Sequence, residues 1–307
     1  MKILYATDGR PPAVAAGELL RKLVHPERVT VTILHASEFG NELVADSHAA
    51  DVLDRAENAF RKAGIRTEKR YLEGEPASRV AKELAREDYH LTVLGAGNNT
   101  WLGRLVFGST STHVLHEAPV PVLVVHRAPD PSHERLHVLV GADGSPSAAH
   151  AIDTLASITE PNRVDIHVRT VVRTHELAFS AYPGAVPTSF IEELLAEEKA
   201  IATRHLNEAL ERVRSLGFTG DGSVGTGWPA NDLLDHAQKM EADLIVVGAR
   251  GIGAIARMTM GSVSAHVAGH APAALVAHAQ AYPMDERAIE ESHGPEVPLG
   301  PDKGSAS

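Results

Sequence analysis

Residues 3–9 read ILYATDG and residues 138–144 read VLVGADG, so each is a short apolar run that ends in Asp-Gly. Their aspartates, Asp8 and Asp143, are 135 positions apart. A short apolar run bounded by a turn signal indicates a buried strand, and its recurrence indicates an internal repeat. We therefore predict that the chain contains two copies of one unit.

Matched glycines and prolines extend the repeat. The matched pairs, each 153 positions apart, are Gly64 and Gly217, Pro76 and Pro229, Gly95 and Gly248, and Gly108 and Gly261. Because the offset grows from 135 to 153, about 18 residues must be inserted in the second copy, between its second strand and its second long helix. Residues 174–190 contain Tyr182, Pro183, Gly184 and Pro187, which are typical of turns, and we predict that they form the inserted loop.

Strand and helix patterns alternate within each copy. In the first copy the predicted strands are residues 3–6, 29–34, 66–72, 91–94 and 122–125, and the predicted helices are residues 13–24, 49–63, 77–86 and 111–116. Helical crossovers join neighbouring parallel strands. We therefore predict an α/β fold of two tandem, doubly wound parallel-sheet domains, each with five strands and with helices on both faces of its sheet.

The predicted domain limits follow from changes in composition. The first domain covers residues 1–128, a linker covers 129–135, the second domain covers 136–280, and a tail covers 281–307. The linker carries two prolines and no apolar periodicity, so we expect it to be extended. The tail is charged and rich in glycine and proline, which predicts disorder.

Composition excludes several classes of protein. The chain has 307 residues, enough for two domains, and no cysteine, so disulfides, Cys-ligated metal sites and thiol nucleophiles are excluded. The net charge of −11 repels a phosphate backbone and disfavours nucleic-acid binding. The longest apolar runs fall far short of the roughly 20 residues of a membrane span, and the N-terminus shows no secretory signal. We expect a cytoplasmic protein that does not bind membranes.

A glycine-rich segment of the second copy predicts a phosphate site. Residues 248–262 have the spacing G-x2-G-x9-G-S, directly after a predicted strand and before a predicted helix. Glycines let the main chain approach a ligand, and the amides of Ser262, Val263 and Ser264 would open the helix with free N–H groups. The hydroxyls of Ser262 and Ser264 could add donors, Arg250 could add charge, and Asp143 could accept from a sugar hydroxyl or a base amine.

These motifs together resemble the universal stress protein family in its tandem two-domain form, over about residues 1–280. The resemblance rests on both Asp-Gly pairs, on Gly-x-Pro at 74–76 and 227–229, on the glycine loop, and on Ala-Pro at 118–119 and 271–272. It implies ATP binding, with Mg²⁺ on the phosphates. The implied contacts in the second copy are Asp143, the backbone of Val171, Gly248, Gly251, Gly261, Ser262 and Ser264.

The first copy departs from the family pattern, because Asn98 stands where the second glycine belongs. The side chain of Asn98 could occupy space that phosphates need. By analogy, the contacts in this copy would be Asp8, Ala36, Gly95, Gly108 and Ser109. The family resemblance also implies that the last strands of the two copies pair, which would make the chain a pseudo-two-fold dimer within itself. A further homodimer is left open.

Each of these sequence patterns also has a simpler structural interpretation. The glycines could only shape a turn, and Asp8 and Asp143 could cap the following helices. Helically spaced histidines, His113 with His116 and His266 with His270, are interpreted as surface residues, so no metal site is predicted. Glutamates at 192–193 and 197–198 are interpreted as a solvated helix face.

The function expected from the sequence is an ATP-binding stress-response or regulatory protein. No catalytic base is visible and no Walker lysine follows the glycines, so we expect no enzyme, although slow ATP hydrolysis is possible. The alternative is a nucleotide-independent interaction scaffold that uses the inserted loop as its contact surface. A nucleotidyl or phosphoryl transferase ranks last.

Overall fold

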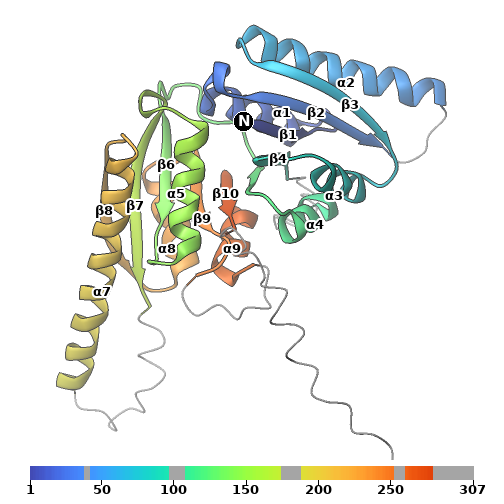
Figure 1. Ribbon diagram of the computed structural model, residues 1–307. Coiled ribbons are helices and arrows are strands. Elements are labelled where there is room, and N and C mark those ends of the chain that lie inside the picture. The colour runs from blue at the N-terminus through green and yellow to red at the C-terminus, as the bar shows by residue number, and fades with distance from the viewer. Residues whose placement is uncertain (38–41, 97–107, 174–187, 252–259, 279–307) are drawn as a thin grey trace, which may run out of the picture.

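The computed structural model describes residues 1–37, 42–96, 108–173, 188–251 and 260–278. The predicted tail, most of the predicted inserted loop and Asn98 therefore lie outside the described residues. The described part consists of β-strands and helices that alternate along the chain, as the sequence pattern predicts (Figure 1).

The two halves contain matching elements. The first half contains β1 (Lys2–Ala6), α1 (Pro11–Leu23), β2 (Thr30–Ser37), α2 (Glu42–Lys62), β3 (Arg66–Glu73), α3 (Pro76–Arg86), β4 (Leu91–Gly95), α4 (Ser109–Glu117) and β5 (Val122–Val125). The second half contains β6 (Leu136–Gly141), α5 (Pro146–Ile158), β7 (Val164–Val172), α7 (Thr188–Ser215), β8 (Gly220–Thr226), α8 (Pro229–Lys239), β9 (Leu244–Gly248), α9 (Ser262–His270) and β10 (Ala273–Ala277). Single 3₁₀ turns, Pro26–Arg28 and Pro161–Arg163, precede β2 and β7.

All ten of these strands form one continuous sheet in the order β3-β2-β1-β4-β5-β10-β9-β6-β7-β8. Within each half the strands are parallel, which confirms the doubly wound fold. The halves meet where β5 and β10 pair antiparallel, with Ala273 opposite Val125 and Val276 opposite Val122. This pairing is the one that the family resemblance implied. It also makes the carboxyl ends of the two sets of strands point to opposite edges of the sheet.

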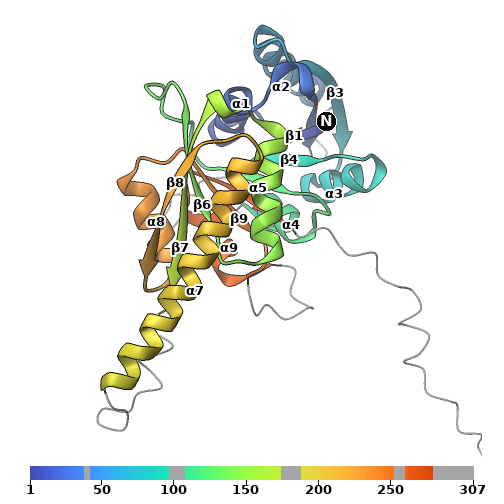
Figure 2. The same cartoon turned by 60° about the vertical axis from the view of Figure 1, so that its left-hand side comes forward.

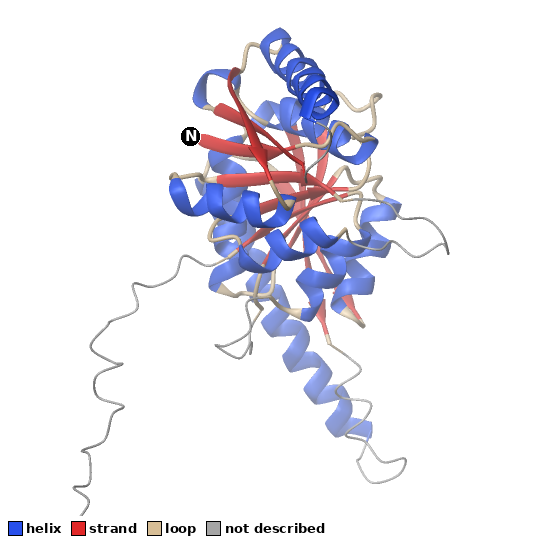
Figure 3. Ribbon diagram, turned by 90° about the vertical axis from the view of Figure 1, so that its right-hand side faces the viewer, coloured by secondary structure: helices blue, strands red, loops and turns tan. Residues whose placement is uncertain are grey.

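Helices cover both faces of this sheet (Figure 3). One buried cluster joins α1, α2, α5 and α7 to one face, and a second joins α3, α4, α8 and α9 to the other. Successive residues of a strand contribute to opposite clusters, as Leu123 and Val124 do. Each cluster contains residues from both halves, so the halves share their core as well as their sheet.

Two helices begin earlier than the sequence pattern predicted. Helix α2 begins at Glu42 instead of 49, because residues 42–48 contain no glycine or proline to stop it. Helix α7 begins at Thr188, so residues 188–190, which we assigned to the inserted loop, are helical. Helix α7 has 28 residues against 21 in α2, and its first turns project beyond the end of β7 (Figure 2). Part of the insertion therefore lengthens a helix.

The two long helices end by the same device. Gly64 and Gly217 follow α2 and α7 with φ of +75° and +87°, a conformation that favours glycine. The next amide in each case reaches back to the last turn, from Ile65 to Phe60 O and from Phe218 to Val213 O. This is the Schellman arrangement, and it explains why these glycines recur at a fixed offset.

Polar contacts also bind the halves together. The Nε2 of His126 donates to the carbonyl of Ala268 at 2.8 Å, across the junction. The linker is held by the buried carboxylate of Asp243, which directly precedes β9. This carboxylate accepts from the amide of Asp130 and from His133 Nδ1 in the linker, and from the amide of His137 in β6, at 2.8–2.9 Å. The linker is therefore anchored to the second half.

The buried His126 at the junction of the two halves predicts that the protein loses stability in acid. Burial lowers the pKa of His126, so the unfolded chain takes up this proton first as the pH falls below about 6.5. Stability is therefore lost as the pH falls from about 6.5 toward the lower folded-state pKa. We expect His126→Gln, which does not titrate, to reduce the loss of Tm between about pH 7.5 and about pH 5.5. Differential scanning fluorimetry measures this, with the exposed His113→Gln as control. An unchanged pH dependence in His126→Gln contradicts the prediction.

Candidate functional site

A hollow of about 340 Å³ lies at the carboxyl ends of the strands of the second half. It opens where the chain order reverses between β6 and β9, which is where doubly wound sheets bind ligands. All the residues that the sequence singled out in the second copy line this one hollow. They are Asp143, Val171, Gly248, Arg250, Gly251, Gly261, Ser262, Val263 and Ser264.

The glycines of this loop permit close packing. A Cβ on Gly248 would lie 2.5 Å from the amide nitrogen of Ala148 in α5, and a Cβ on Gly251 would lie 2.5 Å from Asp143 Oδ2. A Cβ on Gly261 would have the carbonyl oxygen of Ala249 as its nearest neighbour, at 3.4 Å, and the φ of Gly261 is −83°. The first two glycines therefore bring the loop against α5 and Asp143, whereas a Cβ on Gly261 would make only ordinary van der Waals contacts.

Helix α9 presents its N-terminus to the hollow. Gly261 is the N-cap residue, with no side-chain hydrogen bond to cap the helix. The amide of Gly261 itself donates to Ala249 O at 2.7 Å. The amides of Ser262, Val263 and Ser264 follow, and the first turn of an α-helix offers such amides no acceptor within the helix. This end of α9 favours an anion through both its N–H groups and its dipole.

Ser264 differs from what the sequence suggested. Its side chain is buried, and its hydroxyl donates to the carbonyls of Gly248 at 2.6 Å and Ala249 at 3.1 Å. The hydroxyl thus ties α9 to the end of β9 and is already engaged, whereas the exposed Ser262 keeps its hydroxyl at the hollow. Sequence spacing could not separate these two serines.

Asp143 follows β6 and is held by the turn that leads into α5. Its Oδ1 accepts from the amide of Ser145 at 3.0 Å. Ser145, and not Asp143, is the N-cap of α5, because its hydroxyl accepts from the amide of Ala148 at 3.2 Å. The same hydroxyl donates to the carbonyl of Arg250 at 3.2 Å, which fixes the glycine loop against this turn. In the first half the N-cap position is Arg10, and likewise not Asp8.

Two arginines at the hollow escaped the sequence reasoning. Arg169 and Arg173 line it from β7 and its end, beside the predicted Arg250. Arg169 lies in a two-pronged ion pair with Asp232, with Nε–Oδ1 of 2.7 Å and Nη2–Oδ2 of 2.9 Å, and its Nη1 donates to Ser223. The alternation of residues 164–172 is the signal that could have pointed to Arg169.

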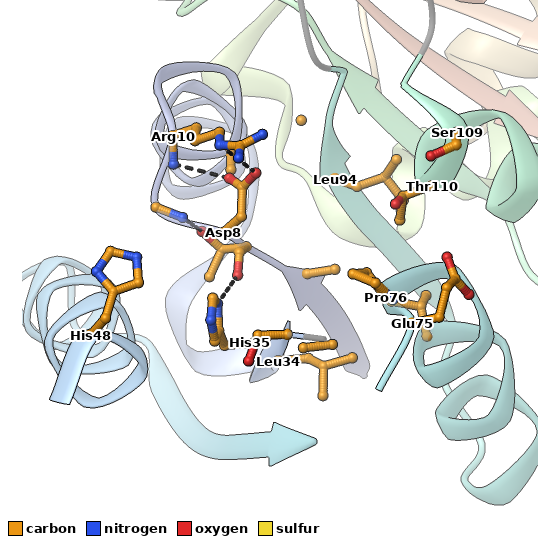
Figure 4. Close-up of a pocket in the computed structure, with 18 residues that line it drawn as sticks. Asp8, Arg10, Leu34, His35, His48, Glu75, Pro76, Leu94, Ser109 and Thr110 are labelled. Carbon is orange, nitrogen blue, oxygen red and sulfur yellow. Dashed lines mark hydrogen bonds and ion pairs between the residues drawn. The ribbon is translucent and has the colours of Figure 1, made fainter. Parts of the chain in front are cut away.

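The first half has its own, larger hollow, of about 700 Å³, at the corresponding place. Asp8, Ala36, Gly95 and Ser109 line it, while Gly108 is the N-cap of α4 and lines an adjoining hollow. In Figure 4 the labelled Asp8 and Arg10 lie on one side and Glu75 and Pro76 on the other. The sequence reasoning did not include His35 and Glu75, which also line it.

The other sequence interpretations concern surface residues. His113 pairs with Glu117 at 3.0 Å, and His270 Nδ1 donates to the carbonyl of His266 at 2.8 Å. Within the described ranges, no group of three or more His, Asp or Glu side chains is arranged to hold a metal ion. Glu192, Glu193 and Glu197 are exposed on α7. Of the described helices, none has the length and apolar character to span a membrane.

The model of the universal stress protein family matches this chain twice, over residues 1–126 and over residues 134–277. The chain therefore belongs to the universal stress protein family and carries its domain in tandem.

Similar proteins include tandem relatives. The universal stress protein Rv2623 of Mycobacterium tuberculosis (strain H37Rv) is 28% identical over 288 residues, covering 87% of this chain and 92% of the relative. Rv2005c of the same strain is 30% identical over 237 residues, covering 73% and 72%. The crystal structure of a universal stress protein from Archaeoglobus fulgidus superposes with a TM-score of 0.62 at 21% identity, covering 91% of this chain and 98% of that one. This structural likeness concerns the fold.

The role of Ser264 leads to a stability prediction. Ser264→Ala removes the buried donor to two carbonyls, so the free energy of unfolding should fall by about 1–3 kcal/mol. Ser262→Ala, on the exposed side of the same helix turn, should change it by less than about 0.5 kcal/mol. Urea denaturation followed by circular dichroism compares the two variants. Equal effects in both would show that the Ser264 hydroxyl does not hold the loop.

Proposed function

We propose that the second half binds ATP, with Mg²⁺ carried on the nucleotide's phosphates, and that the protein uses nucleotide occupancy as a regulatory signal in a stress response. The observation that carries this proposal is the convergence of nine sequence-selected residues on one hollow at the reversal of strand order. Family membership supports it, because the resemblance to this family is what implied ATP binding at the glycine loop.

The phosphates would lie at the N-terminus of α9. The amides of Ser262, Val263 and Ser264 and the hydroxyl of Ser262 offer donors there, and Gly261 lines the same hollow without a side chain. Arg250 and Arg173 add positive charge at the same hollow. A Mg²⁺ ion would reach this site on the phosphate oxygens themselves.

The nucleoside would lie toward β6 and β7. The Oδ1 of Asp143 accepts from the amide of Ser145 in its own turn, and a carboxylate has lone pairs enough to accept from ribose hydroxyls as well. The backbone of Val171 at the end of β7 would contact the base. Apolar side chains of Leu233, Val247 and Met260 line the hollow and suit a planar ring.

The proposed role is regulatory and not enzymatic. Asp143 is the one carboxylate among the described residues that line the hollow, and the proposal already uses it for the ribose. A carboxylate that accepts hydroxyl donors is poorly placed to activate water at the γ-phosphate, so hydrolysis would be slow.

The fold offers a path for the signal. The amide of Ala249, at the start of the glycine loop, donates to the carbonyl of Ala277 at 2.7 Å. Ala277 belongs to β10, and β10 pairs with β5 of the first half. A ligand that orders the loop would therefore act on the strand that joins the two halves. We place the protein in the cytoplasm.

Substitution of Gly261 tests the phosphate site. Gly261→Glu would place a carboxylate beside the phosphates and should weaken Mg·ATP binding about tenfold or more, from loss of a charge-assisted contact and from repulsion. Gly261→Ala should fold normally, because the position has ordinary space and negative φ. Isothermal titration calorimetry measures both.

Gly108→Glu is the matched control in the first half, and it should leave the ATP affinity of the second half unchanged. No heat with the wild-type protein at tens of micromolar, or equal affinity in wild type and Gly261→Glu, would contradict the proposed site. A nucleotide-independent scaffold would then be the better account of the fold.

A further inference from the structure

We infer that the hollow of the first half is a second ligand site of opposite preference: it takes an uncharged purine nucleoside and discriminates against the phosphorylated form. The inference rests on the proposed function in one respect, the assumption that Asp8 and Asp143 accept the corresponding ribose hydroxyls. The two sites cannot share a ligand, because the antiparallel pairing of β5 and β10 points them to opposite edges of the sheet.

The first-half hollow keeps the features that the proposed function assigns to nucleoside binding. Asp8 follows β1 as Asp143 follows β6, and its Oδ1 accepts from the amide of Arg10 in its own turn, at 2.9 Å. Ala36 lines the hollow at the place of Val171. Its volume of about 700 Å³ lies within the range of small-molecule sites.

A buried histidine adds an acceptor at this place. His35 is 4% exposed, and its Nδ1 donates to the carbonyl of Thr7 at 2.8 Å. Because a carbonyl can only accept, the neutral ring keeps Nε2 as an acceptor. The ring lies parallel to Tyr71, with centroids 6.1 Å apart and an interplanar angle of 13°, and meets His48 edge-on. Acceptors and aromatic rings together suit a ring ligand that carries hydroxyl and amine donors.

Among the described residues, the lining of the first-half hollow lacks the excess of arginines that lines the second-half hollow. The described lining of the second-half hollow contains Arg169, Arg173 and Arg250 against Asp143, a net charge of +2, or +1 when Asp232, the partner of Arg169, is included. By the 135-residue offset, the place of Arg169 is taken in the first half by the apolar Leu34.

Acidic side chains outnumber basic ones among the described residues that line the first-half hollow. Asp8 and Glu75 oppose the single Arg10 among the described lining residues, a net charge of −1 with neutral histidines. Arg10 is exposed, and its Nε lies 3.6 Å from Asp8 Oδ2.

Glu75 holds its negative charge at the edge of the hollow. It is the N-cap of α3, and its two carboxylate oxygens accept from the amides of Ala77 at 3.0 Å and Ser78 at 2.6 Å. These two bonds fix the position of the carboxylate at the N-terminus of α3. The equivalent N-cap of α8 is the uncharged Trp228. A phosphate in the first-half hollow would meet this fixed carboxylate, whereas a nucleoside would not.

The test uses the full-length chain with both parts of the second site disabled, the nucleoside contact by Asp143→Asn and the phosphate contact by Gly261→Glu, or by Arg250→Glu if the Gly261 variant does not fold. Isothermal titration with adenosine should show one site per chain, and Mg·ATP should bind at least about tenfold more weakly, because charge repulsion opposes it. Asp8→Asn should abolish the adenosine heat. Asp51→Asn, an exposed carboxylate of α2, is the matched control and should leave that heat unchanged.

Glu75→Gln separates charge from cavity shape. It keeps one acceptor for the α3 amides and should raise ATP affinity at the first site about three- to tenfold while leaving adenosine affinity unchanged. Tighter binding of ATP than of adenosine, no adenosine binding, or an adenosine heat that survives Asp8→Asn would each overturn the inference.

The outcome is independent of the second site. Failure of the proposed function appears as wild-type ATP binding that is absent or unaffected by Gly261→Glu. Failure of the present inference appears in the adenosine titrations and in their dependence on Asp8.

Discussion

The antiparallel pairing of β5 with β10 is the constraint on which the rest of the structure depends. An edge strand exposes unpaired N–H and C=O groups, and each half would present such an edge if it stood alone. Pairing the two edges within one chain satisfies both and buries Val122 through Val125 completely. It also merges the two cores into one cluster on each face and sends the two ligand-sized hollows to opposite edges.

Duplication preserved the backbone while the charges diverged. Both halves end their long helices with a left-handed glycine and begin α4 and α9 at an uncapped Gly. The described residues that line the two hollows nevertheless carry opposite net charge, since arginines predominate in one and Asp8 and Glu75 in the other. In a low-dielectric crevice such charges affect ligand affinity strongly, even where the backbone shape is shared. The two proposals rest on this divergence of charge between otherwise matching halves.

The sequence predicted the architecture well and the details of the site unevenly. The repeat offset and the five strands of each half were predictable, because burial forces a regular pattern on Val, Leu and Ile, whereas the pairing of the last strands came only from the family resemblance. The start of α7 was misplaced, because Pro187 and its neighbours suggest a loop while Ser189 and Glu192 already favour a helix. Arg169 was missed because the alternation of residues 164–172 shows which face of β7 it lies on but does not show that a cavity opens there.

The sequence by itself determined the duplicated α/β fold, the glycine loop and the two aspartates, since these follow from local spacing and from the special backbone freedom of glycine. Only the tertiary structure decided which groups are available to a ligand. It turned the hydroxyl of Ser264 inward to two carbonyls, paired Arg169 with Asp232, 63 positions away, and set Glu75 on the first turn of α3 at the edge of a crevice. The contacts of Ser264 and Arg169 join residues that are distant in the chain, so their partners are fixed by packing and not by neighbouring sequence. Glu75 has local partners, but only the packing of α3 brings it to the hollow.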